Sequence, residues 1–231
     1  MIDIKKQLQN INNSINQAEI KAQRSSGSVQ LLAVSKTWPA ATLRLAAQAG
    51  QNCFGENYLQ EALVKIDELS ELELEWHFIG PIQSNKTRDI AAHFDWVQSI
   101  DRLKIAQRLN DQRNEQQAVL NVCIQVNIDN ENSKSGVNAE NVISLAQQIS
   151  QLSRLKLRGI MVIPTKTDHL SQQQSAFLRA HHLYSELQQQ FPGIDTLSMG
   201  MTHDMQIAIS AGSTMVRVGT GLFGQRLTPN V

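Results

Sequence analysis

Lys36 is the residue whose place in the sequence points most clearly to chemistry. It closely follows four consecutive apolar residues, 31–34, which predict a short strand buried on both faces. An amine at the end of such a strand loses hydration, and a partly desolvated amine can condense with an aldehyde. The alternative is a lysine whose stem carries its ammonium out to solvent. Thr37 is expected to cap the helix that follows, with Pro39 in its first turn.

Two clusters of hydroxyl and glycine residues near the carboxyl terminus are suited to binding an anion. They consist of Ser198, Met199 and Gly200, and of Gly219, Thr220 and Gly221. Glycine lets backbone N–H groups approach a phosphate closely, and the hydroxyls add donors. A short helix expected after Thr202 or Asp204 would direct its positive end to the same place. Tight turns without a ligand are the alternative.

Arg217 lies two residues before Gly219, so alternation along a strand turns both to the same side. There it is either a structural ion-pair partner or a ligand contact. A lysine that can form a Schiff base, a phosphate site and an arginine on the same side are together typical of pyridoxal 5'-phosphate sites, because the ring nitrogen of that cofactor needs a partner.

Metal and serine-hydrolase chemistry are less consistent with the sequence. Its six histidines include no pair four residues apart and no H-E-x-x-H motif, so no metal site is expected. A Ser-His-Asp triad would need a G-x-S-x-G turn, which the sequence lacks.

The elements that must position these residues alternate regularly along the chain. An amphipathic helix is expected over 2–24, and seven helical segments separate eight short strands. The strands are expected at 31–36, 53–55, 76–80, 96–100, 119–127, 157–163, 196–199 and 215–219. Such alternation predicts an α/β fold, a single (β/α)8 TIM barrel with an extra N-terminal helix. An open doubly wound sheet is less consistent, because VSKTWPA stands where a G-x-G-x-x-G loop would be expected.

Composition narrows the class of protein. The chain has 231 residues with 21 basic and 21 acidic side chains, which suits one domain over 1–231 and predicts no binding to nucleic acid or to a membrane. No segment has the length and apolarity of a signal peptide or a membrane span. Cys53 and Cys123 are expected to be small core residues, and the cytoplasm is the expected compartment.

At this point several motifs resemble a known family. The segments LLAVSKTWP, FGENYLQE, EWHFIGPIQSNK, VNIDNENSKSG, LRGIMVIP, LSMGMTHDM and GSTMVRVGTGLFG resemble, in matching order, the pyridoxal phosphate homeostasis proteins. That family is similar in fold to the barrel domain of alanine racemases and of bacterial-type ornithine decarboxylases. The mild departures are Trp38 after Ser-Lys-Thr, and Thr202-His203 before Asp204.

The resemblance implies a role for each candidate residue. Lys36 would hold pyridoxal phosphate as a Schiff base, and Arg217 would face its ring nitrogen. The phosphate would be held by Ser198, Met199 or Gly200, together with Gly219 and Thr220. Asn57 and Lys134 match family positions near the pocket, with less settled roles, and the roles of Lys86 and Tyr58 stay open.

Two functions remain open after this comparison of motifs. The first is a cofactor-binding homeostasis protein, monomeric and without substrate turnover, that stores pyridoxal phosphate or delivers it to apo enzymes. The second is a small amino-acid racemase or a Schiff-base aldolase on the same barrel. A racemase would need a tyrosine, for which Tyr58 is the candidate near the rim. An aldolase would need an acid or base beside Lys36, for which Glu56 and Glu61 are the local candidates.

Overall fold

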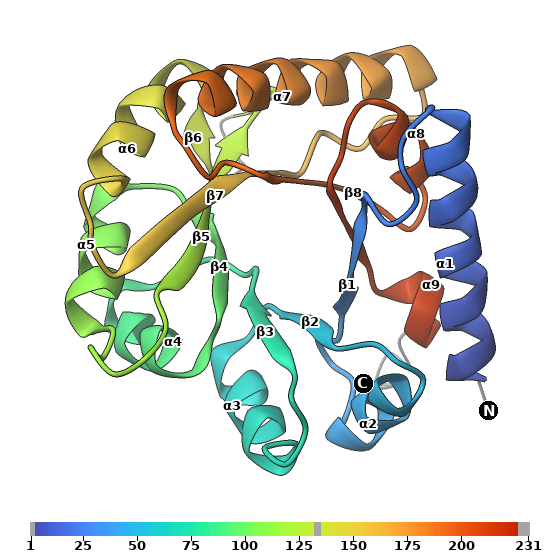
Figure 1. Ribbon diagram of the computed structural model, residues 1–231, viewed down its shortest axis with the longest axis horizontal. Helices are drawn as coiled ribbons and strands as arrows, with labels where there is room; N and C mark the ends of the chain where they lie inside the picture. Colours follow the sequence, from blue (N-terminus) through green and yellow to red (C-terminus); the bar gives the residue numbers. More distant parts are fainter. Residues whose placement is uncertain (1–2, 132–134, 226–231) are drawn as a thin grey trace.

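Eight parallel strands close into a barrel in the computed structural model, which describes residues 3–131 and 135–225 (Figure 1). The strands follow the order β4-β3-β2-β1-β9-β8-β7-β5, and pairing of β4 with β5 closes the ring. They are β1 (Gln30–Val34), β2 (Cys53–Glu56), β3 (Glu75–Phe78), β4 (Trp96–Ile100), β5 (Leu120–Asn127), β7 (Leu155–Val162), β8 (Thr196–Met201) and β9 (Met215–Val218). A two-residue strand, β6 (Val137–Asn138), pairs with β5 outside the ring. The predicted TIM barrel is confirmed.

Helices surround the barrel, and one of them precedes the first strand (Figure 1). They are α1 (Ile4–Lys21), α2 (Ala40–Gln48), α3 (Leu59–Glu68), α4 (Thr87–His93), α5 (Leu103–Gln112), α6 (Val142–Ile149), α7 (Leu170–Gln190), α8 (Met205–Ser210) and α9 (Thr220–Phe223), with short 3-10 turns η1 (Ser84–Lys86) and η2 (Ala139–Asn141). The extra helix α1 packs on α8 and α9. None of the helices in the described ranges is long and apolar enough to cross a membrane.

The N-terminal helix is joined to the barrel by buried polar groups as well as by its apolar face. The Asp3 side chain accepts the N–H of Lys6 and so caps the first turn. Near the other end, the buried Glu19 carboxylate accepts the backbone N–H groups of Gly27 and Val29. These bonds hold the loop before β1, which fixes where the first strand starts.

Side chains along each strand alternate between the barrel interior and the layer of helices. Two apolar clusters fill the interior, formed by Leu32, Cys53 and Met215 and by Trp96, Cys123 and Met161. The intervening residues, such as Ala33 and Phe54, belong to the larger core between strands and helices. The side chains of Leu32 and Val34 in β1 therefore point to the barrel interior, and Lys36, just after the strand, continues this alternation.

The turn after β1 differs from the sequence prediction. The strand ends at Val34, and Thr37 does not cap α2, because Pro39 occupies the position before its first residue. Thr37 instead has a φ of 70°, in the left-handed region. A residue with a Cβ pays about 1–2 kcal/mol for that conformation, so other contacts must hold the turn.

Candidate functional site

A cavity of about 260 Å³ lies at the carboxyl ends of the barrel strands. Its volume is just below the roughly 300–1,000 Å³ typical of small-molecule sites. Five of the residues singled out in the sequence line it, namely Lys36, Asn57, Arg217, Gly219 and Thr220. None of the described residues around this cavity is acidic, while Lys36 and Arg217 bring positive charge to it. The cavity therefore favours an anionic ligand.

Lys36 reaches the cavity from a turn that continues the β1–β2 ladder. The N–H of Ser35 donates to the Gly55 carbonyl at 3.0 Å, one residue beyond the end of β1. Lys36 is half-buried and lies on the same side of the chain as Val34, which also lines the cavity. The barrel thus presents the amine to the cavity in a partly desolvated setting.

Arg217 is buried in the wall of the same cavity, with 4% of its surface exposed. Its Nη1 donates to the Ser198 carbonyl at 2.7 Å and to Ser198 Oγ at 2.8 Å, and its Nη2 donates to the Val162 carbonyl at 2.9 Å. Burial lowers the pKa of the guanidinium to about 10, so it still carries its charge at neutral pH. These bonds fix the plane of the guanidinium against the ends of β7 and β8.

The backbone of Asn57 packs directly against Gly80, which follows β3. A Cβ added to Gly80 would lie 2.2 Å from the Asn57 carbonyl oxygen, so only glycine permits this contact after β3. Asn57 Oδ1 is buried and accepts no hydrogen bond from the described residues. An unpaired buried acceptor of this kind is uncommon in folded proteins.

Ser198, Met199 and Gly200 do not line this cavity. Ser198 is fully buried, and its hydroxyl donates to Gln98 Oε1 at 2.7 Å inside the barrel. Met199 is fully buried in the core between strands and helices. Gly200 has a φ of 94°, and a Cβ there would lie 2.5 Å from the Cβ of Ala208, so glycine at this position lets α8 pack closely on β8.

The strand β8 contributes other residues to the cavity, which the sequence reasoning did not assign to it. Met201, the last residue of the strand, lines the cavity together with Thr202 and His203, which follow it. The apolar wall comes from Val34, Ile79, Met161 and Ile163. Thr202 Oγ1 also accepts the N–H of Gly221 at 3.3 Å, which joins the loops after β8 and β9. Their signal in the sequence is the position of Thr202 and His203 immediately after the glycine-containing segment.

The remaining candidates lie elsewhere or outside the described residues. Tyr58 is 54% exposed at the start of α3, and Tyr184 is buried on α7; neither lines the cavity. Lys86 ends the short turn η1 and does not line the cavity either. Lys134 falls outside the described residues.

A chain of hydrogen-bonded side chains runs from Arg217 at the cavity into the barrel interior. Beyond Ser198, the Gln98 amide bonds His77 Nδ1 at 2.9 Å, and His77 Nε2 bonds Glu75 Oε1 at 2.8 Å. The His77 ring is completely buried and stacks on Trp96 with centroids 5.0 Å apart. Burial lowers the pKa of His77, and the neighbouring Glu75 only partly offsets this effect. The interior is therefore polar along this chain of hydrogen bonds although most of it is apolar.

Three residues whose side chains are of the kinds that bind metals lie close together at the end of this chain of hydrogen bonds, away from Arg217. The ligand atoms of Cys53, Glu75 and His77 lie within 4.8 Å of one another. Sequence spacing did not reveal the group, because it depends on the pairing of Cys53 with Glu75 across β2 and β3. The thiol and the ring nitrogen both bond Glu75 Oε1, and burial raises the pKa of the Cys53 thiol to about 12. The three groups thus satisfy one another as a hydrogen-bonded set.

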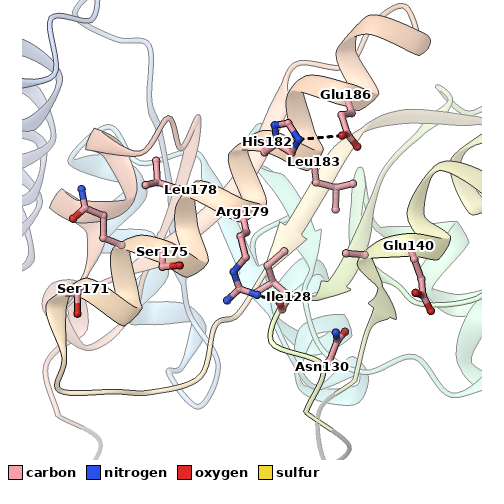
Figure 2. Close-up of a pocket in the computed structure, with 12 residues that line it drawn as sticks. Ile128, Asn130, Glu140, Ser171, Ser175, Leu178, Arg179, His182, Leu183 and Glu186 are labelled. Atoms are coloured by element: carbon pink, nitrogen blue, oxygen red, sulfur yellow. Dashed lines mark hydrogen bonds and ion pairs between the residues drawn. The ribbon is translucent and has the colours of Figure 1, made fainter.

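A larger hollow of about 860 Å³ lies between α7 and the segment after β5 (Figure 2). Three of its charged or titratable side chains are already engaged, since Arg179 donates to Asp129 and to the Ile128 carbonyl, and His182 bonds Glu186. None of the candidate residues named in the sequence lines it. The cavity at the barrel mouth is therefore the candidate site.

The alanine racemase N-terminal domain model matches residues 7–227 of the chain. The pyridoxal phosphate homeostasis protein of Pasteurella multocida is 52% identical over 227 residues, which cover 96% of this chain and 97% of that protein. The chain belongs to the pyridoxal phosphate homeostasis protein family. PipY of Synechococcus elongatus is a second relative, and its structure has been solved with pyridoxal phosphate bound. PipY is 39% identical to this chain, and the two superpose with a TM-score of 0.80 over 96% of this chain and all of PipY.

The likeness to a solved alanine racemase concerns the fold alone. The enzyme of Clostridium difficile superposes with a TM-score of 0.76 over 96% of this chain and 58% of the racemase, at 13% identity. The barrel is therefore common to both, whereas the racemase chain extends well beyond it.

Proposed function

We propose that this protein binds pyridoxal 5'-phosphate in the cavity at the barrel mouth, as a Schiff base on Lys36. The observation that carries the proposal is the meeting of Lys36, Arg217 and the loops after β8 and β9 around one cavity. Asn57 lines the same cavity, as the sequence motifs implied. The family relationship supports it further, since PipY has been solved with this cofactor.

Each group around the cavity has a task in this proposal. The cofactor supplies an aldehyde, and the Lys36 amine condenses with it, forming a C=N bond and releasing one water. The amine must first lose a proton, because only the neutral amine attacks the aldehyde. Thr202, Gly219 and Thr220 are the groups proposed to hold the phosphate. Ser198 is left out of this set because Gln98 and Arg217 already engage its hydroxyl.

Arg217 is proposed to face the ring nitrogen and to limit catalysis. Arginine only donates hydrogen bonds, so it leaves a pyridine nitrogen unprotonated and makes the ring a weaker electron sink than an acidic partner would. The acid and base groups that an aldolase would need are also turned away, because Glu56 and Glu61 bond Lys65 on the far side of β1 and β2. These features favour storage and delivery of the cofactor over turnover of a substrate.

A racemase or aldolase remains the alternative function. His203 lines the cavity and is exposed, so it is the described side chain best placed to move a proton there. We favour the homeostasis role, exercised by a single-domain monomer in the cytoplasm with apo enzymes as recipients.

The two functions predict opposite outcomes with amino acids. Protein loaded with pyridoxal phosphate and incubated with L-amino acids in deuterated water should show no sustained exchange of the α-hydrogen by NMR. The same loaded protein should restore the activity of an apo enzyme that requires the cofactor. Exchange over many turnovers, lost in Lys36→Ala, would establish the racemase instead. Failure to restore the apo enzyme would contradict delivery.

A further inference from the structure

We propose that Lys65, Glu56 and Glu61 are positioning residues that hold the main chain on both sides of Lys36 and thereby strengthen cofactor binding. The inference rests on the proposed function, because its effect on the ligand requires that Lys36 carries pyridoxal phosphate. None of the three residues lines the cavity. They are proposed to act only through the backbone of the turn.

Lys65 is the centre of this cluster, on α3 behind β1 and β2. Only 3% of it is exposed. Its Nζ donates to the Ser35 carbonyl at 2.8 Å, to Glu56 Oε1 at 2.7 Å and to Glu61 Oε1 at 2.5 Å. The ammonium therefore uses its three donors on two carboxylates and on the residue before Lys36.

Glu56 holds the same residue from a second direction. Its Oε1 accepts the Ser35 hydroxyl at 2.6 Å as well as the Lys65 ammonium. The carboxylate is fully buried, and burial raises its pKa while Lys65 lowers it. Desolvating such a pair is costly, and an apolar pair of similar volume is often no less stable. We therefore expect the Lys65–Glu56 pair to matter more for the geometry of the turn than for the stability of the fold.

Glu61 holds the residue on the other side of Lys36. Its Oε1 accepts the N–H of Thr37 at 2.5 Å and also contacts Lys65. Thr37 is the residue with the left-handed φ of 70°, which a side chain other than glycine adopts reluctantly. The bond to Glu61 thus stabilises the conformation that the turn would otherwise leave.

The cluster and the cavity lie on opposite faces of the same strands. Val34 and Lys36 line the cavity, whereas Ser35 and Glu56 are turned toward α3. A turn held from behind presents the Lys36 amine in few orientations before the cofactor arrives. Less conformational entropy is then lost on binding, and the affinity is higher.

Substitutions of Glu61 test this, because its side chain is 30% exposed and the fold depends on it less than on Lys65. Glu61→Ala removes the acceptor for Thr37 and should weaken binding of pyridoxal phosphate about tenfold, as expected for a lost preorganising contact. Glu61→Gln keeps an acceptor and should bind like wild type. Glu61→Asp keeps the charge but withdraws the acceptor, so it should weaken binding as alanine does. Glu71→Ala, which removes an exposed ion pair with Arg44, is the matched control.

A second readout is independent of the cofactor. Hydrogen exchange at the Thr37 amide should accelerate in Glu61→Ala and Glu61→Asp, and stay slow in Glu61→Gln. Faster exchange together with wild-type affinity for pyridoxal phosphate would overturn the positioning role. Unchanged exchange would show that Glu61 does not hold the turn. If wild type itself forms no Schiff base on Lys36, the proposed function fails, whereas the exchange data still report on the cluster.

Discussion

Thr220→Asp should weaken binding of pyridoxal phosphate by about three to five orders of magnitude. Thr220 lines the mouth cavity at the start of α9, where the phosphate is proposed to bind. The substitution removes a hydroxyl bond to a charged group, worth about 1.5–3 kcal/mol. It also adds a like charge, which at a separation of about 5 Å costs roughly 3 kcal/mol at an effective dielectric constant of about 20. Titration of the Schiff-base absorbance measures the affinity.

Two controls separate the charge from the shape of the loop. Thr220→Asn has nearly the same size as the aspartate variant but no charge, so it should lose about tenfold or less. Pyridoxal without the phosphate should bind Thr220→Asp and wild type almost equally. Similar losses for both ligands would mean that the loop after β9 shapes the barrel instead of holding the phosphate.

Lys65→Met should lower the free energy of unfolding by about 3–5 kcal/mol at neutral pH, because it leaves the buried Glu56 carboxylate without its partner. Burial already raises the pKa of Glu56, and removing the ammonium raises it further. The folded variant then binds a proton more readily than the unfolded chain, so its deficit relative to wild type should shrink as the pH falls from 7 toward 5. Urea unfolding at several pH values measures both effects.

The double variant Lys65→Met with Glu56→Gln tests the cause of that loss. Replacing the unpaired Glu56 carboxylate by a neutral amide should recover much of the lost stability. It should also abolish the pH-dependent part of the stability difference from wild type. A loss below about 1 kcal/mol in Lys65→Met alone would contradict the buried ion pair, since that is the range of an exposed one.

The barrel and the place of Lys36 at its mouth could be predicted from the sequence because both depend on local patterns. Short apolar runs separated by helical spacing predict the strands, and the carboxyl end of a strand predicts the place of Lys36. Arg217 and Gly219 both line the cavity, and β9 keeps a regular register up to Val218, just before Gly219.

The residues that the sequence misplaced lie where the backbone departs from that regularity. The pairing of β8 with β9 shifts register between Ser198 and Met201, next to the positive φ of Gly200. After this irregularity, Thr202 and His203 line the cavity, while Ser198 stays in the interior. A sequence pattern does not show such a shift, which lies where Gly200 packs closely against α8.

The cluster behind Lys36 could not be predicted for a different reason. From the sequence, Glu56 and Glu61 are only candidates for the acid or base of an aldolase, and nothing in the sequence points to Lys65. Their role depends on the docking of α3 against β1 and β2, which buries Lys65 against the Ser35 carbonyl.

The attachment point of the cofactor tests the central claim most directly. Wild-type protein is incubated with pyridoxal phosphate and treated with borohydride, which reduces a C=N bond to a stable secondary amine, and the peptides are then mapped by mass spectrometry. We predict one adduct per chain, on the peptide that contains Lys36, and none on that site in Lys36→Ala. An adduct mainly on Lys86 or Lys134, or no adduct in wild type, would contradict the account.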